Sequence, residues 1–253
     1  MKKRIWIGTM SLFLPVFLFA QSANEQLQKA NDLYKQLKES EALNAYKSVL
    51  SVDSDNMTAL VKCTELCSSL GKKQSDKNNR NNYYTEAKQY ADKALANNPD
   101  SADAYYLQAL SYANLSQTED ENKKIVEDVK LIKSNADKGL AINPAHTRLN
   151  YMAGKWHLEM INLNWFKKAA LKTLYGNGLQ KPDIDSAIFF MGKCKSLEPY
   201  FVQNYLDLAK AYEAKKRPTD EIEILNQMVK LPNRTADDAT LKNEGKKMLQ
   251  ALE

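Results

Sequence analysis

The sequence predicts an all-α protein in which antiparallel helix pairs stack into a solenoid. Glycine and proline are scarce, with 8 and 7 copies in 253 residues, and a chain rich in alanine, leucine, lysine and glutamine favours helix throughout. The segments 92–99 (DKALANNP) and 137–144 (DKGLAINP) nearly duplicate each other. Such internal similarity indicates a repeated structural unit, and we expect about ten to thirteen helices and no sheet.

Small and aromatic residues recur at the spacing of the tetratricopeptide repeat, a helix–turn–helix unit. Tyr205, Leu208, Ala209 and Tyr212 mark the first helix of one unit, and Gly154 takes the small-residue position of another. Paired helices approach closely only where a side chain is short, so these positions have a packing role. The pattern therefore predicts a tetratricopeptide-like solenoid.

The repeat period is irregular, which predicts insertions between helices. Segments 72–82, 116–122 and 175–182 are rich in polar residues, glycine or proline and are predicted loops. Segment 235–253 has an amphipathic pattern, and the last unit of a solenoid must cover its open end. We therefore assign residues 21–253 to one tetratricopeptide-like α-solenoid that ends in a capping helix.

Residues 1–20 have the layout of a secretory signal peptide. Basic residues at positions 2–4 precede an apolar run that ends at Ala20. The run is shorter than the roughly 20 apolar residues of a membrane-spanning helix, and it contains Pro15. We expect cleavage after Ala20, with Ala23 as the second choice and an uncleaved anchor as the alternative. The predicted protein is exported, periplasmic or secreted, and has no membrane span after cleavage.

The charge balance gives no indication of a nucleic-acid partner. The chain has 36 Lys and Arg against 31 Asp and Glu. Three of the positive charges lie in the predicted signal peptide, so the rest of the chain carries 33 against 31. Both signs are interleaved along it, a pattern typical of solvated helix faces rather than of a basic binding surface.

The sequence lacks the residue sets that metal binding or catalysis requires. His146 and His157 are the two histidines and stand eleven positions apart, whereas a zinc site needs three or four converging ligands. His157 takes a core position of the repeat, where we expect it to be packed and hydrogen-bonded. Cys63 and Cys67 are four apart on a predicted helix, too distant for a disulfide, and are predicted buried thiols. We predict no cofactor, no metal and no enzymatic activity.

Four motifs carry a resemblance to a known family. They are 154–156 (GKW), 163–170 (LNWFKKAA), 174–176 (LYG) and 204–212 (NYLDLAKAY). With them, segment 144–253 resembles the regulator of microtubule dynamics family, a group of divergent tetratricopeptide-like proteins. The resemblance implies a helical-repeat fold and a binding role without catalysis. It does not imply microtubule binding here, because an exported chain would not meet a microtubule.

Seven residues fall at first-helix positions that usually face the concave side of such a solenoid. A groove lined by aromatic and polar side chains can hold an extended peptide, although these residues would also be ordinary on a partly exposed helix. The candidate partner-binding residues are Tyr34, Tyr106, Asn114, Tyr151, Lys155, Glu159 and Lys210.

The first functional hypothesis is an exported scaffold without enzymatic activity that binds a protein or peptide in its concave groove. An alternative is a small-molecule-binding protein or enzyme with a pocket near the 165–182 insertion. A third is a structural envelope component that self-associates. The sequence specifies neither the partner nor the oligomeric state.

Overall fold

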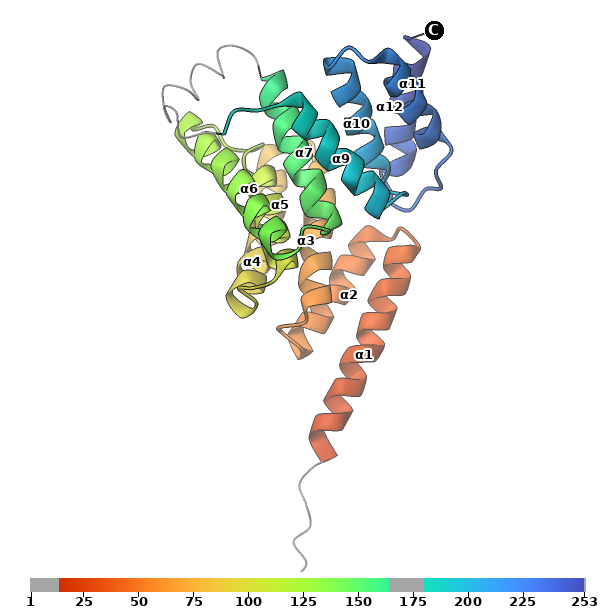
Figure 1. Cartoon of the computed structure of the whole chain (residues 1–253). Helices are drawn as coiled ribbons and strands as arrows, with labels where there is room; N and C mark the ends of the chain where they lie inside the picture. The colour runs from red at the N-terminus through yellow and green to blue at the C-terminus, as the bar shows by residue number, and fades with distance from the viewer. Residues whose placement is uncertain (1–13, 164–179, 253) are drawn as a thin grey trace, which may run out of the picture.

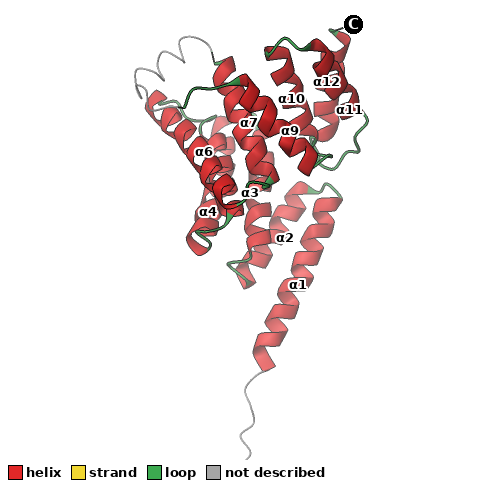
Figure 2. Ribbon diagram, viewed as in Figure 1, coloured by secondary structure: helices red, strands yellow, loops and turns green. Residues whose placement is uncertain are grey.

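The computed structural model describes residues 14–163 and 180–252, and in these residues it contains eleven helices and no strand (Figure 2). The all-α prediction is therefore confirmed. Most of the predicted 165–182 insertion lies outside the described residues. The helices are α1 (Leu14–Lys35), α2 (Glu39–Val52), α3 (Met57–Lys72), α4 (Lys77–Asn97), α5 (Ala102–Leu115), α6 (Asn122–Ile142), α7 (Thr147–Asn162), α9 (Ile184–Leu197), α10 (Val202–Ala214), α11 (Pro218–Val229) and α12 (Asp238–Gln250).

Consecutive helices form five antiparallel pairs, and the pairs stack side by side (Figure 1). The pairs are α1 with α2, α3 with α4, α5 with α6, α7 with α9, and α10 with α11. The first helices of successive pairs also touch, from α3 to α5, α7 and α10. They form an inner layer, and the second helices form an outer one. This arrangement confirms the predicted tetratricopeptide-like solenoid.

Short side chains lie where paired helices approach most closely. Gly154 of α7 faces α9, and a Cβ atom built on it would stand 2.7 Å from Met191 Cγ and 3.0 Å from the Ala187 carbonyl oxygen. Gly139 of α6 lies between its partner α5 and the next pair, where an added Cβ would stand 3.1 Å from Tyr105 Cβ and would also meet Leu149 of α7. The small repeat positions therefore have the packing role that was predicted for them. The short side chain at each position sets the distance between the helices.

The same type of tight turn connects the two helices of the first pair, α1 and α2, and the two helices of the last pair, α10 and α11. Leu37 follows α1 with a φ of 60°, and Lys216 follows α10 with a φ of 59°. In each turn the next amide, of Lys38 or Arg217, donates to a carbonyl five residues earlier, at 3.1 and 2.9 Å. This bond satisfies a helix-end carbonyl and reverses the chain within three residues. The two outermost pairs thus share one turn geometry.

The prediction of a loop over residues 72–82 is wrong. Helix α3 continues to Lys72 and α4 begins at Lys77, so the connection is only four residues long. The Asp76 side chain accepts the backbone N–H of Asn79 at 2.8 Å and starts α4 there. A cap of this kind stabilises a helix start even in a polar segment that is rich in asparagine.

Helix α12 occupies the segment expected to cap the solenoid. It packs against α10 and α11, and Leu241 belongs to their shared core. The helix begins at Asp238, three residues later than predicted. The Asp238 carboxylate accepts the backbone N–H groups of Arg234 and Thr235 at 2.7 and 2.9 Å, which holds the preceding residues in a turn.

Helix α1 is continuous through Ala20 and Ala23, the two predicted cleavage sites. None of the helices within the described ranges combines the length and the apolar character that crossing a bilayer demands.

Candidate functional site

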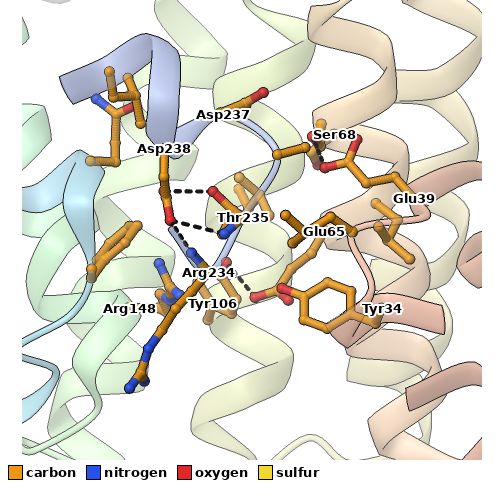
Figure 3. Close-up of a pocket in the computed structure, with 18 residues that line it drawn as sticks. Tyr34, Glu39, Glu65, Ser68, Tyr106, Arg148, Arg234, Thr235, Asp237 and Asp238 are labelled. Atoms are coloured by element: carbon orange, nitrogen blue, oxygen red, sulfur yellow. Dashed lines mark hydrogen bonds between the residues drawn. The ribbon is translucent and has the colours of Figure 1, made fainter. Parts of the chain in front are cut away.

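Two adjoining cavities lie over the inner layer of helices. The smaller one, of about 230 Å³, lies between α3, α5 and residues 234–238, and we call it the end cavity (Figure 3). The larger one, of about 600 Å³, lies between α3, α5, α6 and α7, and we call it the central cavity. Ser68, Ser69, Leu110 and Gln203 line both. The two cavities are therefore parts of one groove.

Six of the seven candidate residues line this groove. Tyr34 and Tyr106 line the end cavity. Those that line the central cavity are Asn114, Tyr151, Lys155 and Glu159. The repeat positions thus lead to one continuous surface, although the aromatic members are less exposed than expected. Tyr106 and Tyr151 are buried, and each is hydrogen-bonded within the chain.

Lys210 does not line the groove. It lies near the far end of the inner layer, where its ammonium group pairs with Glu244 of α12 at 2.7 Å. Helix α12 covers the face of α10 that would have faced the groove in a longer solenoid. The candidate site therefore excludes Lys210.

A hydrogen-bonded acid lies at the floor of the end cavity. The Tyr106 hydroxyl donates to Glu65 Oε1 at 3.1 Å, and Lys62 pairs with Glu65 at 2.9 Å. Burial opposes ionisation of Glu65, but the charges of Lys62 and Arg148 outweigh it and lower the pKa of the carboxyl. Arg148 in turn pairs with Glu198 at 3.0 Å. The charges at this end are thus compensated within the chain.

A second buried acid, Asp207, lies beside the central cavity. Its Oδ2 accepts the Tyr151 hydroxyl at 2.7 Å, the Lys155 ammonium group at 3.0 Å and the Gln203 amide at 3.1 Å. Burial alone would lower the pKa of Lys155, but the carboxylates of Asp207 and Glu159 raise it. Lys155 therefore keeps its proton. The network ties α7 to α10 along the groove.

The deeper walls of the central cavity are apolar. Trp156 is held by a bond from Nε1 to the Val129 carbonyl oxygen at 3.1 Å, so its indole nitrogen is already satisfied. The other large apolar side chains that line the cavity are Leu110, Val129, Ile132, Met152, Met160 and Leu163. The polar lining residues include Lys72 and Glu159, which are exposed, and Asn114, which is buried and donates to Ser68 Oγ at 2.6 Å.

The sequence reasoning missed Lys72, Arg148 and Gln203 as groove residues, and Asp207 as the buried acid beside them. The detectable signal was at Asp207, because a carboxylate between two leucines in an apolar helix needs a partner there. The other three occupy positions that the repeat pattern leaves open to any polar residue. Their place in the groove depends on how far neighbouring pairs rotate, which the pattern does not specify.

Both histidines have partners within the chain. His146 accepts the backbone N–H of Leu149 at its Nδ1 and bonds Asp103 through Nε2 at 2.9 Å. His157 is 1 % exposed and accepts the backbone N–H of Asp183 at 3.1 Å. Residues 14–163 and 180–252 contain no cluster of three or more His, Cys, Asp or Glu side chains suited to a metal ion. Cys63 and Cys67 are buried free thiols, as predicted, and so is Cys194.

The fold and the groove define a helical-repeat protein of the tetratricopeptide class, a class that presents extended concave binding surfaces. Two solved structures resemble this chain in fold. A tetratricopeptide-repeat protein of Thermus thermophilus has a TM-score of 0.62 at 15% identity, over 90% of this chain and 99% of that one. The PilF protein of Pseudomonas aeruginosa has a TM-score of 0.53 at 10% identity, over 92% of this chain and 90% of that one.

Residues 26–253 match the model of the family described as regulator of microtubule dynamics protein 1-3, and the chain belongs to that family. The match extends into the N-terminal half, where the sequence reasoning found only a general repeat pattern. Protein 1 of this family from Caenorhabditis elegans is 28% identical over 128 residues, which are 51% of this chain and 56% of the relative. Protein 3 from Xenopus laevis is 26% identical over 177 residues, which are 70% of this chain and 38% of the relative. The chain thus spans between about a third and somewhat more than half of these relatives.

Proposed function

We propose that this protein is a non-catalytic scaffold that binds a segment of a partner protein in the groove. The observation that supports it is the continuity of the two cavities over the inner faces of α3, α5 and α7. A cavity with apolar walls and a polar rim suits a peptide, whose side chains and backbone need both kinds of contact. A nucleic acid would need a run of uncompensated positive charge, whereas Lys62, Lys73, Arg148 and Lys155 of this region are each paired with an acid.

We further propose that the chain acts outside the cytoplasm. Support comes from the basic and apolar pattern of residues 1–20, which is typical of an export signal. The relatives are named as regulators of microtubule dynamics, but an exported chain would not meet a microtubule, and we do not extend that activity to it. Fractionation of native cells, with mass spectrometry of the protein's N-terminus, tests both export and cleavage. A full-length protein in the cytoplasm would contradict the proposal.

The binding proposal is tested by affinity purification with the mature protein and chemical cross-linking. We expect cross-links from a defined partner to map to α3, α5 and α7. Tyr106→Ala and Lys155→Glu should each reduce recovery of that partner by about tenfold, the scale of a hot-spot residue. Lys210→Glu is the matched control, because it makes the same charge change outside the groove. Recovery that none of the groove variants changes would contradict the proposal.

A second candidate function is the binding of a small molecule in the central cavity. Its volume of about 600 Å³ lies within the range of roughly 300–1,000 Å³ that is usual for ligand pockets. Leu163, two residues before the predicted insertion, is part of its wall. Native mass spectrometry of the protein purified from its source tests this function. Ala113 also lines this cavity. A discrete mass increment that is absent from the Ala113→Trp variant would support a small ligand.

A further inference from the structure

We propose that the partner segment carries a bulky apolar side chain that enters the central cavity, with an acidic residue beside it that pairs with Lys72. This inference rests on the proposed function and specifies the chemistry of the partner. It follows from three features of the cavity, namely its apolar walls, the hydrogen-bond acceptors in its lining, and Lys72, a lining charge without an acidic partner among residues 14–163 and 180–252.

The walls call for an apolar group. Trp156 has no spare donor because its Nε1 is bonded to Val129, and Met152 and Met160 offer thioethers, which adapt to the shape of a ligand. A polar side chain placed against these walls would lose its water without gaining a hydrogen bond. A volume of about 600 Å³ accommodates a large aromatic or aliphatic side chain with room for the neighbouring backbone.

Two residues of the cavity lining offer acceptors for the backbone of an extended segment. The side-chain amide of Asn114 donates to Ser68, and that of Gln203 donates to Asp207. Within the described ranges, the carboxamide oxygens of Asn114 and Gln203 have no donor. Both residues line the central cavity, so these oxygens can accept backbone N–H groups of a bound segment.

The charge at the rim selects an acid. Lys155 is already paired with Asp207 and Glu159, at 3.0 and 3.8 Å. Lys73, the neighbour of Lys72, pairs with acids of the end cavity. Lys72 lines the central cavity and is exposed, and no carboxylate among residues 14–163 and 180–252 pairs with it. A carboxylate of the partner would complete the charge balance of the groove.

A displayed library of random peptides tests the inference. Peptides of about twelve residues are long enough to cross the groove when extended. We expect selection on the mature protein to enrich sequences in which a Phe, Leu, Met or Trp stands within two positions of an Asp or Glu. Synthetic peptides with the selected sequence, labelled for fluorescence anisotropy, then give dissociation constants for the variants.

Two variants with matched controls probe the cavity and the charge separately. Ala113→Trp fills the central cavity and should weaken binding by at least about tenfold, whereas Ala214→Trp, at an exposed alanine outside it, should not change binding. Lys72→Glu should weaken an acidic peptide about three- to tenfold at low salt. Lys123→Glu reverses an exposed charge elsewhere and should have no effect.

The outcomes separate this inference from the proposed function. Selected peptides that need Tyr106 and Lys155 but lack the apolar or the acidic residue would overturn the inference and leave groove binding intact. Peptides whose affinity is unchanged by both Ala113→Trp and Lys72→Glu would also overturn the inference and leave groove binding intact. A library that yields no peptide sensitive to any groove variant would count against both. If Ala113→Trp fails to fold, loss of affinity on replacing the peptide's apolar residue by alanine supplies the same test.

Discussion

At the scale of single residues, the absence of a side chain at Gly154 determines how closely α7 and α9 approach. The atoms that an added Cβ would meet include the Ala187 carbonyl oxygen and the Met191 amide nitrogen, at 3.0 and 3.1 Å. Backbone atoms cannot move aside as a flexible side chain can. The steric limit therefore acts on the packing of the whole helix pair.

Gly154→Ala should consequently destabilise the protein. We expect the free energy of unfolding to fall by about 1–3 kcal/mol, the usual cost of overpacking. Gly192→Ala on the neighbouring helix is the control, because a Cβ there meets nothing within 4 Å. That variant should be neutral or stabilising by up to about 1 kcal/mol, since alanine favours helix over glycine. Chemical denaturation measures both, and equal effects of the two substitutions would contradict this account.

His157 should make stability depend on pH. Burial lowers the pKa of its imidazole below the ordinary value of 6.5, and the neutral ring accepts the Asp183 backbone N–H. Below about pH 6.5 the unfolded chain binds a proton that the folded chain does not, so the free energy of unfolding should fall as the pH drops further. At higher pH the imidazole is neutral in both states, so His157 should not make the free energy of unfolding depend on pH.

The measurement is the free energy of unfolding at several values between about pH 7.5 and 5.5. His157→Asn keeps a hydrogen-bond acceptor but does not titrate in this range, so its stability should decline less than that of the natural protein on acidification. Parallel pH profiles for the two proteins would exclude His157 as the source of the dependence.

The repeat pattern correctly predicted a groove residue wherever its position along a first helix is enough to place it in the groove. Tyr106, Asn114, Tyr151 and Lys155 follow from their place on a first helix. Lys210 has the same kind of position, but it lies beside α12 and pairs with Glu244 of that helix. The pattern describes one helix pair and its neighbours. What the last helix covers is set by the end of the solenoid, which a repeat pattern does not describe.

At the scale of helices, the Asp207 network joins α7 to α10 beside the groove. Asp207→Asn would leave Lys155 with only Glu159 as its partner, at 3.8 Å. We expect the free energy of unfolding to fall by about 1–3 kcal/mol, because a partly buried charge loses its nearest counter-charge. Asp220→Asn, which breaks an exposed pair with Arg217, should cost about 0.5 kcal/mol or less. Thermal or chemical denaturation compares the two, and costs of equal size would contradict a special role for Asp207.

The order of the helices was predictable because small residues recur at helical spacing and prolines follow the ends of several repeat units. Helix boundaries were less predictable. Helix α4 begins five residues before the end of the predicted loop, since one capping side chain, Asp76, outweighs a polar composition. A single hydrogen bond of this kind contributes about 1 kcal/mol, and residue composition does not reveal whether the local geometry forms it.

At the scale of the whole molecule, the first and last units meet across the end cavity. Lys73, after α3, pairs with Glu39 of α2 and with Asp237 before α12, the latter at 3.3 Å. Residues 234–238 form the opposite wall of that cavity (Figure 3). The guanidinium group of Arg234 packs over the Tyr200 ring, 3.8 Å from its centre. A partner segment that leaves the central cavity on this side therefore meets a wall made by the chain itself.

Reversing the charge of Asp237 should open this end of the groove. In Asp237→Lys an attractive contact with Lys73 becomes repulsive, so residues 234–238 should detach more often. An arginine-specific protease detects the change as cleavage after Arg234, because cleavage reports the population of the open form. We expect about three- to tenfold faster cleavage, the scale of an exposed ion pair and its reversal. The double variant Lys73→Glu with Asp237→Lys restores opposite charges and should return the rate to within about twofold of the natural one. Asp120→Lys breaks an exposed pair with Lys77 elsewhere and should leave cleavage unchanged. If Asp237→Lys is cleaved no faster than this control, the ion pair does not hold the two ends together, and the end cavity is closed by packing alone.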